Sequence, residues 1–414
     1  MKIGFVGLGK LGLPVALAVE KKGHSVYGYD LNKNVKTYLE KKEIPYKEVH
    51  VPDFIQNNEI NFTDLDTVTR NSDIIFMAVQ TPHEALYEGT TRIPESRADF
   101  DYSMLRQAAK SVSDSVDKQS GRKIVVIIST VLPGTIQEQI QPLLSDKIDL
   151  VYNPFFIAMG NTINDFYYPE FVLLGTDAET QIADHVKSFY KTIHDAPVYH
   201  TTIKNAEFIK VAYNTFIGMK IAYANTIMEI CHKIGADCDG VIDGISMANQ
   251  RLISSKYLRG GMGDGGGCHP RDNIAMSWLA KKLNLSHDFF EDIMMARENQ
   301  TKWLAELCVE HDMPICILGK SFKPETNIVT GSPAVLLANL LNEIGKKPVH
   351  IDPHVNENFD SEFNKITNSH VFFIGTQHDA FKSLVFPSNS VVIDPFRYMP
   401  KNQKDVKYIS IGKL

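Results

Sequence analysis

The 414-residue sequence lacks any long hydrophobic run and any recognisable targeting segment. No apolar stretch approaches the ~18 residues that a membrane-spanning helix needs. The residues after Met1 show neither the basic region nor the cleavage site of a signal peptide. A net charge of −6 argues against nucleic acid or an anionic membrane as the main partner. These features predict a cytoplasmic protein.

Cysteine is scarce, and its spacing excludes two further classes of protein. The five cysteines form an odd count without the close pairs of a zinc site: Cys231, Cys238, Cys268, Cys308 and Cys316. We therefore expect no disulfide framework and no metal. A reducing compartment would leave a thiol available for chemistry.

Glycine, by contrast, is concentrated in one place. Six of the eight residues from Gly260 to Gly267 are glycine, and Cys268, Arg271 and Asp272 follow. Because glycine costs folding entropy, such a run suggests a backbone that must lie close to a ligand. A cation near a cysteine favours the reactive thiolate. The plainer interpretation is a flexible linker with an inert buried cysteine.

A dinucleotide-binding fingerprint opens the chain. The apolar run 2–6 leads into Gly-Leu-Gly-Lys-Leu-Gly at 7–12, a helical stretch at 13–22, and a second apolar run at 25–29 that ends in Asp30. The glycines allow a tight turn and a close approach of pyrophosphate to the helix N-terminus. Asp30 would hold the ribose hydroxyls and repel a 2′-phosphate, so the pattern predicts NAD rather than NADP.

Further strand-like runs end in small or polar residues, as the strands of an open α/β sheet do. They cover 72–79, 123–128 and 147–152, and lead into Thr81-Pro82, into Ser129 to Thr135, and into Asn153-Pro154. Ligands bind beyond the carboxyl ends of such strands, so these loops are expected to line a cofactor cleft. The alternative is that they are simply turns.

A long apolar helix is predicted from Asn205 to about Gly235. Lys210, Asn214, Gly218, Ile221 and Asn225 share one stripe at helical spacing. A solvated lysine is the usual case, but the apolar neighbours of Lys210 indicate partial burial. A buried ammonium needs a partner, and a catalytic oxyanion could serve. A helix of this length also suits a dimer interface.

A second α/β unit without a glycine fingerprint begins near Pro314. Strands are expected at 314–318, 348–351, 370–374 and 391–393, and a helix at 332–344. The fold class is therefore α/β, with two doubly wound, Rossmann-like domains joined by a central helical segment. We predict an NAD-binding domain at 1–200, a central helical segment at 201–300, and a C-terminal domain at 301–414 that binds something other than a second NAD.

Nine stretches in this order resemble the UDP-glucose/GDP-mannose dehydrogenase family over nearly the whole chain. They read GLGKLG with Asp30, VQTP, STVLPGT, AEFIKVAYN, NQR, GDGGGCHPRD, GKSFKP, IDPHV and TQHDAF. The resemblance implies oxidation of the C6 primary alcohol of a nucleotide-linked hexose to a carboxylate with two NAD. UDP-glucose is the substrate we expect, and a homodimer formed by the central helices is the expected assembly.

The resemblance also assigns roles to single residues. Cys268 would be the nucleophile, with Lys210 and Asn214 stabilising an oxyanion, Asp272 positioning or deprotonating water, and Thr130 near the nicotinamide. The cofactor contacts it implies are Gly7, Gly9, Leu11, Gly12, Asp30, Val79, Thr81, Pro82, Ser129, Thr130 and Arg271. The substrate contacts it implies are Lys210, Asn214, Arg251 (reaching the neighbouring subunit's sugar), Tyr257, Leu258, Gly261, Lys323 and Arg397.

Two segments depart from the family pattern. Residues 153–160 read NPFFIAMG, with Phe155 and Met159 where the family has glutamates. Neither side chain can transfer a proton. Thr330 stands where the family has an arginine that touches the cofactor. These changes leave the fold intact but bear on the second oxidation and on the identity of the sugar.

Three functions therefore remain open. The first is a four-electron nucleotide-sugar 6-dehydrogenase that uses Cys268. The second is a two-electron or atypical-sugar enzyme of the same fold. The third is a binding protein that keeps NAD for structure. Two, one or no NADH produced per sugar would distinguish them.

Overall fold

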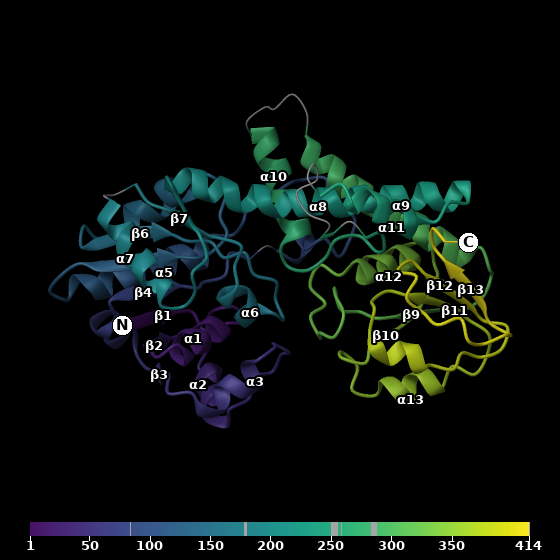
Figure 1. Ribbon diagram of the computed structural model, residues 1–414, viewed down its shortest axis with the longest axis horizontal. Coiled ribbons are helices and arrows are strands. Elements are labelled where there is room, and N and C mark those ends of the chain that lie inside the picture. Colours follow the sequence, from purple (N-terminus) through teal and green to yellow (C-terminus); the bar gives the residue numbers. More distant parts are fainter. Residues whose placement is uncertain (83, 178–179, 250–255, 258, 283–287, 414) are drawn as a thin grey trace. The chain divides into compact units, whose positions relative to one another are not determined.

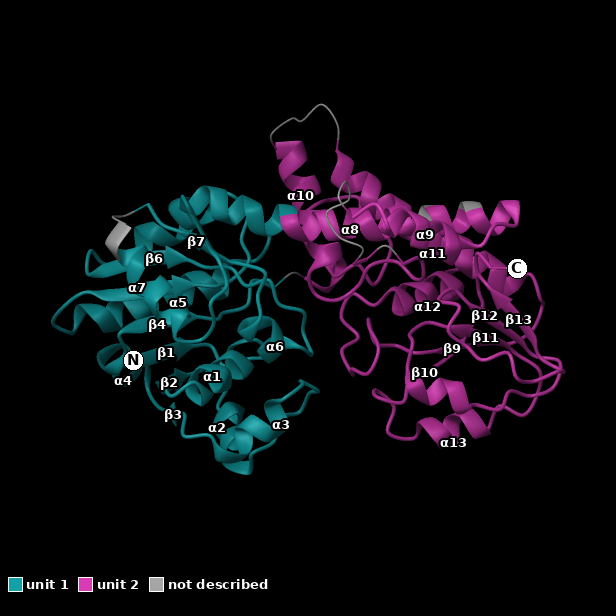
Figure 2. Ribbon diagram, in the orientation of Figure 1, with its two compact units in different colours: residues 1–82, 100–212 teal, residues 83–99, 213–414 magenta. Residues whose placement is uncertain are grey.

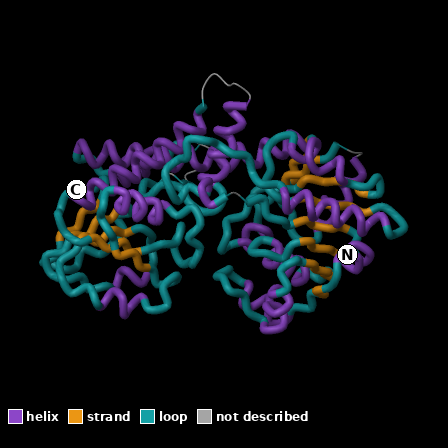
Figure 3. Tube along the Cα trace, turned by 180° about the vertical axis from the view of Figure 1, so that it is seen from behind, coloured by secondary structure: helices purple, strands orange, loops and turns teal. Residues whose placement is uncertain are grey.

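The computed structural model describes residues 1–82, 84–177, 180–249, 256–257, 259–282 and 288–413. The chain forms two compact units (Figure 2). Unit 1 comprises residues 1–82 and 100–212, and unit 2 comprises residues 83–99 and 213–414. Both units are α/β, with helices covering a mainly parallel sheet (Figures 1 and 3). Arg251 and Leu258, two of the predicted substrate contacts, lie outside the described residues.

The sheet of unit 1 has the order β3-β2-β1-β4-β5-β6-β7-β8. Its strands are β1 (Lys2–Val6), β2 (Ser25–Tyr29), β3 (Asn61–Phe62), β4 (Ile74–Met77), β5 (Lys123–Ile127), β6 (Ile148–Tyr152), β7 (Val172–Gly175) and β8 (Val198–Thr201). All neighbours pair parallel except β6 and β7. The first six strands have the order typical of a dinucleotide-binding domain, with a change of direction between β1 and β4.

Helices cover this sheet because its strands are apolar on both faces. They are α1 (Gly12–Lys21), α2 (Asn34–Lys41), α3 (Val51–Phe54), α4 (Leu65–Asn71), α5 (Ser103–Asp117), α6 (Thr162–Tyr167) and α7 (Thr180–Lys191), with the short turns η1 (Ile55–Asn57), η3 (Ile136–Ile140) and η4 (Gln141–Leu143). Leu13 and Leu17 of α1 and Phe189 of α7 share one core with Phe5 and Phe76. This packing holds α1 against the sheet, so that its N-terminus lies at the glycine turn after β1.

The sheet of unit 2 has the order β10-β9-β11-β12-β13, and all its strands are parallel. The strands are β9 (Ile315–Leu318), β10 (Val349–Ile351), β11 (Val371–Ile374), β12 (Val391–Asp394) and β13 (Lys407–Ser410). The order is again doubly wound, with its change of direction between β9 and β11. Ligands of such sheets bind beyond the carboxyl ends of the strands at that point.

Alternate residues of the second sheet enter two different cores. Ile315, Ile317 and Phe373 pack with Leu337 on one face, whereas Cys316, Leu318 and Phe372 pack with Phe363 on the other. Successive side chains of a strand point to opposite faces, so a sheet covered on both faces needs continuous apolar runs. Unit 2 also contains η2 (Ala85–Tyr87), α9 (Cys238–Ser246), α10 (His269–Lys282), α11 (Phe289–Val309), α12 (Pro333–Glu343), α13 (Phe359–Asn364) and η5 (Asp379–Ser383).

One helix, α8 (Ile203–Ile234), continues from unit 1 into unit 2. It begins two residues before the predicted start and ends one residue before the predicted end. Its residues up to 212 belong to unit 1, and those from 213 onward belong to unit 2. Within the described part of the chain, neither α8 nor any other helix is long and apolar enough to cross a membrane.

Candidate active site

The glycine turn after β1 is shaped by its own packing and leaves one position open. Gly7 has φ +96°, and a Cβ on Gly12 would lie 2.1 Å from the carbonyl oxygen of Gly7. A Cβ on Gly9 would meet nothing closer than 4.0 Å. The backbone at Gly9 and the N-terminus of α1 are therefore accessible to an anionic group such as pyrophosphate.

The loops at the neighbouring strand ends are tied to one another. Asp30, after β2, accepts hydrogen bonds from the backbone N–H groups of Leu8 (2.6 Å) and Asn32 (2.7 Å). The hydroxyl of Thr81 donates to the carbonyl of Thr130 (2.8 Å), and that of Ser129 donates to the carbonyl of Val79 (2.6 Å). The predicted cofactor residues of unit 1, including Leu11 and Pro82, thus gather at one edge of its sheet.

Lys210, on α8, is buried as its sequence context predicted. The residue is 5% exposed, and its ammonium group lies 5.0 Å from the centre of the Phe156 ring. A cation over an aromatic face gains electrostatic stabilisation from the ring. The alternative of a solvated surface lysine is wrong.

Glu207, one turn before Lys210, is a residue that the sequence did not single out. Its carboxylate accepts hydrogen bonds from the backbone N–H groups of Gly134 (2.6 Å) and Ile136 (2.8 Å), and the residue is fully buried. It fixes the loop that carries Thr130 to the helix that carries Lys210. Burial raises the pKa of this carboxyl to about 7, although the two N–H donors act in the opposite direction.

The atypical loop 153–160 turns one of its aromatic residues away from Lys210. Phe155 packs against the core of the sheet, with its ring centre 5.7 Å from that of Phe166 and 6.4 Å from that of Phe76. Phe156 instead faces the Lys210 ammonium. Residue 155 therefore contributes packing, and no acidic side chain lies within residues 153–160.

In unit 2, Asn214 and Asp272 form a buried polar pair. The amide of Asn214 donates to Asp272 Oδ2 at 2.5 Å, and Arg271 donates to Asp272 Oδ1 through Nε (3.1 Å) and Nη2 (3.0 Å). Asp272 is fully buried, and both of its carboxylate oxygens are engaged. The geometry thus makes Asp272 an anchor for Asn214.

Cys268 lies immediately before α10 and is connected to this pair. Its carbonyl accepts the backbone N–H of Asp272 at 2.8 Å, which is the first hydrogen bond of the helix. The positive end of the helix dipole favours an anion at this position. Cys268 is half-buried, whereas the other four cysteines are buried. Burial raises the pKa of Cys316 to about 12, which is typical of an inert structural thiol.

Packing within unit 2 explains most of the glycine run before Cys268. A Cβ on Gly261 would lie 2.6 Å from the ring of Phe396, and one on Gly266, with φ +83°, would lie 2.9 Å from that of Phe322. Gly260, Gly263 and Gly265 are similarly enclosed, whereas Gly267 faces open space. Five of the six glycines are therefore required by packing within the protein. The expectation that the run lets a ligand approach the backbone can apply only to Gly267.

A buried ion pair holds this glycine segment in place. Arg297 of α11 pairs with Asp264 (Nε to Oδ1, 2.9 Å) and donates to the carbonyl oxygens of Gly89 (2.9 Å) and Gly331 (3.2 Å). Asn225 of α8 adds a second anchor, since it bonds the N–H of Gly261 and the carbonyl of Met262. No sequence pattern indicated the Arg297 pair, because its partners are scattered along the chain.

The predicted substrate residues of unit 2 have different environments. Arg397 is used internally: its side chain is 4% exposed, pairs with Asp239 at 2.9 Å and donates to the carbonyl of Gly260 at 2.7 Å. Lys323 is half-buried over the Phe322 ring, and Tyr257 is exposed with φ +64°. Arg397 supports the glycine segment, and Lys323 and Tyr257 lie at the surface.

The fold of unit 1 and its glycine turn are those of a dinucleotide-binding domain, and comparison with known proteins identifies the family. Three domains match in order: the UDP-glucose/GDP-mannose dehydrogenase family NAD binding domain over residues 1–194, the central domain over 204–299, and the UDP binding domain over 316–401. The chain belongs to the UDP-glucose/GDP-mannose dehydrogenase family, whose members include nucleotide-sugar 6-dehydrogenases. It binds NAD, and the open Gly9 at the start of α1 fits that cofactor.

Individual relatives differ in the substrate that they name. A GDP-mannose 6-dehydrogenase of Pseudomonas aeruginosa is 27% identical over 97% of both chains. A UDP-glucose 6-dehydrogenase of Bacillus subtilis is 30% identical over 85% of this chain and 76% of its own. The solved UDP-glucose dehydrogenase of Pyrobaculum islandicum has the same fold, with a TM-score of 0.88 at 23% identity, covering 100% of this chain and 98% of that one.

Proposed function

We propose that this protein oxidises the C6 primary alcohol of a nucleotide-linked hexose to a carboxylate, with Cys268 as the nucleophile. One observation carries the proposal. Cys268 is linked through the first turn of α10 to Asp272, and Asp272 is bonded to Asn214, one turn along α8 from the buried Lys210. A protein that only bound sugars would have little use for this arrangement.

The chemistry assigns each group a task. Bound NAD supplies the hydride acceptor for both oxidations. In the first, C6 loses a hydride and its hydroxyl loses a proton, which gives an aldehyde. The Cys268 sulfur then bonds to the aldehyde carbon, and the protonated adduct is a thiohemiacetal. Lys210 and the Asn214 amide stabilise the negative charge that develops on oxygen during this addition.

Loss of a second hydride and of the hydroxyl proton gives a thioester. Water then attacks the carbonyl carbon, the C–S bond breaks, and the products are a carboxylate and the free Cys268 thiolate. One alcohol and one water yield one carboxylate, two hydrides and three protons. Because residues 153–160 contain no acid, the water must be activated by another group or react more slowly.

We propose UDP-glucose as the first substrate to test, because residues 316–401 match the family's UDP binding domain. GDP-mannose must be tested beside it, because relatives named for either sugar match this chain about equally well. Purified protein should be given UDP-glucose, GDP-mannose and UDP-N-acetylmannosamine in turn, and NADH should be counted per sugar consumed. Two NADH per sugar with one of them supports the proposal. A ratio of one, or no turnover with any, contradicts it.

Replacing the thiol separates the two oxidations. We expect Cys268→Ser to stall the second oxidation by orders of magnitude while NAD binding survives, because serine is a far weaker nucleophile. Single-turnover NADH formation and NAD titration measure the two effects. Cys231→Ala, which removes a buried thiol on α8, is the matched control and should keep full turnover. Unchanged turnover in Cys268→Ser would remove the sulfur from the mechanism.

A two-electron enzyme is the second candidate, and Phe155 favours it. The side chain at that position is packed in the core, so loop 153–160 offers no base for hydrolysing a thioester. Such an enzyme releases an aldehyde with one NADH per sugar. Trapping the product with a carbonyl reagent identifies it.

We further propose that the protein is a cytoplasmic homodimer that associates through its central helices. Phe216 and Tyr223 of α8, seven residues apart and thus on one face, are 38% and 51% exposed. Exposed aromatic side chains aligned on one helix are typical of a protein–protein interface.

A further inference from the structure

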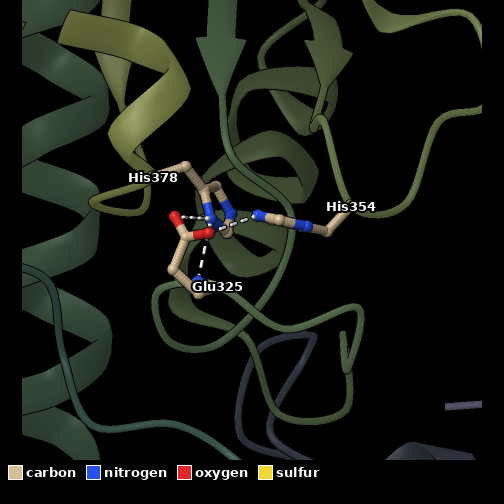
Figure 4. A group of neighbouring side chains, drawn as sticks. All are labelled: Glu325, His354 and His378. Atoms are coloured by element: carbon tan, nitrogen blue, oxygen red, sulfur yellow. Dashed lines mark hydrogen bonds and ion pairs between the residues drawn. The ribbon is translucent and has the colours of Figure 1, made fainter. Parts of the chain in front are cut away.

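Unit 2 contains a cluster of metal-binding side chains that lies outside the proposed reaction. Glu325, His354 and His378 come from the loops that follow β9, β10 and β11, three adjacent parallel strands. The three side chains face one another at the carboxyl edge of the sheet (Figure 4). Their sequence spacing gives no hint of a site, because the order of the strands brings them together.

The distances between the donor atoms suit one small divalent cation. Glu325 Oε2 lies 3.0 Å from His354 Nε2, and Glu325 Oε1 lies 3.6 Å from His378 Nδ1. All three donor atoms lie within 4.8 Å of one another. Ligand atoms bound tetrahedrally to zinc at ~2.1 Å are about 3.4 Å apart. The three donor atoms are therefore close enough to share one metal, once the His378 ring or the Glu325 backbone moves so that Nδ1 can face it.

The hydrogen-bond partners of His378 determine which nitrogen of its imidazole ring carries the hydrogen. The backbone N–H of Glu325 can only donate, so His378 Nδ1, 3.0 Å away, carries a lone pair. The other nitrogen, Nε2, then carries the hydrogen, and both Ser321 Oγ (2.8 Å) and Asp352 Oδ2 (3.0 Å) are close enough to accept it. Asp352 is itself held by the N–H groups of Lys320 (2.6 Å) and Ser321 (2.9 Å). A carboxylate behind a histidine is the usual outer shell of a metal-binding imidazole.

A metal would replace two existing interactions. It would take the Nδ1 lone pair from the Glu325 N–H, and it would displace the hydrogen now between His354 and Glu325. The metal–ligand bonds would have to outweigh both losses, because one contact involves the Glu325 carboxylate and the other leaves a backbone N–H without its acceptor. The Glu325 carboxylate also keeps an outer partner, the N–H of Asp379, 2.9 Å from Oε1.

We propose that Glu325, His354 and His378 bind a divalent transition metal of the zinc class. Two imidazoles and one carboxylate suit Zn²⁺, Co²⁺ or Ni²⁺, whereas Mg²⁺ and Ca²⁺ prefer oxygen ligands alone. His378 is buried, His354 is 15% exposed, and Glu325 is 52% exposed, so a coordination position remains open toward solvent. The metal would join three loops of unit 2, one of which carries Lys323 two residues before Glu325. This proposal does not depend on the dehydrogenase chemistry.

The test uses full-length, tag-free protein treated with a chelator and then titrated with Co²⁺ or Zn²⁺ alone. We expect one equivalent of Co²⁺ to bind with visible absorption bands of low-symmetry coordination, and Zn²⁺ to raise the melting temperature. His354→Ala and Glu325→Gln should each weaken binding by about tenfold or more. Both residues are partly exposed, so these variants should stay folded, which circular dichroism checks.

Two controls make the result decisive. His185→Ala removes an exposed imidazole from unit 1 and should leave the affinity unchanged. Cys268→Ser must bind metal like the parent protein, because a thiol is also a zinc ligand. Absence of stoichiometric binding overturns the proposal. So does binding that persists unchanged in both His354→Ala and Glu325→Gln, or that disappears in Cys268→Ser.

Discussion

Buried charge marks the residues that organise the proposed site. Glu207, Lys210, Asp272 and Arg297 are each at most 5% exposed, although all four can ionise. Burying a charge is costly unless it is paired or hydrogen-bonded, so each has acquired a fixed set of neighbours. These neighbours hold each of the four side chains in a fixed position within its own unit.

The carboxyl of Glu207 gives the first prediction at this scale. Its pKa is raised from 4.5 to about 7 by burial, so the folded protein binds this proton more tightly than the unfolded chain. The associated stability is present below the unfolded pKa and is lost as pH rises toward 7, with a total on the order of 3 kcal/mol. Relative to Glu207→Gln, the parent protein should lose about that much unfolding free energy between about pH 5 and about pH 8.

Urea unfolding at the two pH values measures this difference. Glu40→Gln, which changes an exposed glutamate on α2, is the control and should run parallel to the parent protein. If Glu207→Gln also ran parallel to the parent, the carboxyl would not titrate in this range, and the raised pKa would be wrong.

Lys210 gives the second prediction. We expect Lys210→Ala to lower kcat by about 10²-fold or more while nucleotide-sugar affinity changes much less, since an oxyanion contact acts mainly in the transition state. Steady-state kinetics and a separate binding titration resolve the two quantities. A variant impaired only in affinity would identify Lys210 as a structural lysine over the Phe156 ring.

At the residue scale, sequence patterns located side chains that sit next to glycine motifs or on one helical stripe. Lys210 and Asn214 were predictable because two polar residues interrupt an apolar stripe. Glu207 was not, because its partners are backbone N–H groups about 70 residues away, and backbone donors leave no pattern in a sequence. Phe155 was recognised as unusual, but only the packing of its ring showed that it turns into the core.

At the scale of single elements, one helical glycine is required by a tight contact and another is not. Gly218, in the part of α8 that belongs to unit 2, is tightly enclosed. An added Cβ would lie 2.8 Å from Asn273 Nδ2 and 3.3 Å from Asp264 Oδ2. Gly244 of α9 is exposed, and a Cβ there would meet nothing within 4 Å. Both glycines have helical backbone, but only Gly218 lacks room for a side chain.

This pair makes a matched prediction. Gly244→Ala should raise the free energy of unfolding by about 0.5–1 kcal/mol, because alanine is the better helix former. Gly218→Ala should lower it by about 1–3 kcal/mol, because the methyl group overpacks a tight contact. Denaturant titration of both variants decides the matter, and stabilisation by Gly218→Ala would mean that the neighbouring amide moves aside freely.

Elements with a strong apolar run were predictable, and short or edge strands were not. The runs 2–6 and 25–29 match β1 and β2 to the residue. The run 72–79 contains β4 but is two residues too long at each end: the apolar pair Ala78-Val79 extended it beyond the strand, and the polar pair Ser72-Asp73 precedes the strand. The two-residue β3 and the edge strand β8, Val-Tyr-His-Thr, carry too little hydrophobic signal to stand out.

At the scale of the whole molecule, the exposed aromatic side chains of α8 bear on assembly. If Phe216 and Tyr223 lie in a dimer interface, then introducing charge there should separate the subunits. We expect the double variant Phe216→Glu/Tyr223→Glu to have the mass of one chain and the parent protein that of two, as measured by light scattering. Leu31→Glu, which alters an exposed leucine in unit 1, should remain dimeric. A monomeric parent protein would refute the dimer.

The division into two units was only partly accessible from the sequence. The boundary between unit 1 and unit 2 within α8 has no signal in the sequence, because the helix is continuous across it. Residues 83–99 belong to unit 2 although unit 1 surrounds them in the chain. Arg92 explains this grouping, because it pairs with Glu298 of α11 (3.0 Å) and Glu343 of α12 (2.6 Å), some 200 residues away or more.

The continuity of α8 has a consequence for how this chain can diverge. Each helical residue advances the chain by ~1.5 Å and turns it by ~100°. A single residue inserted between Ala212 and Tyr213 would therefore swing Asn214 to a different side of the rod from Lys210, even if every other side chain were kept. Substitutions can accumulate along this helix, but the number of residues between Lys210 and Asn214 cannot change without separating their side chains.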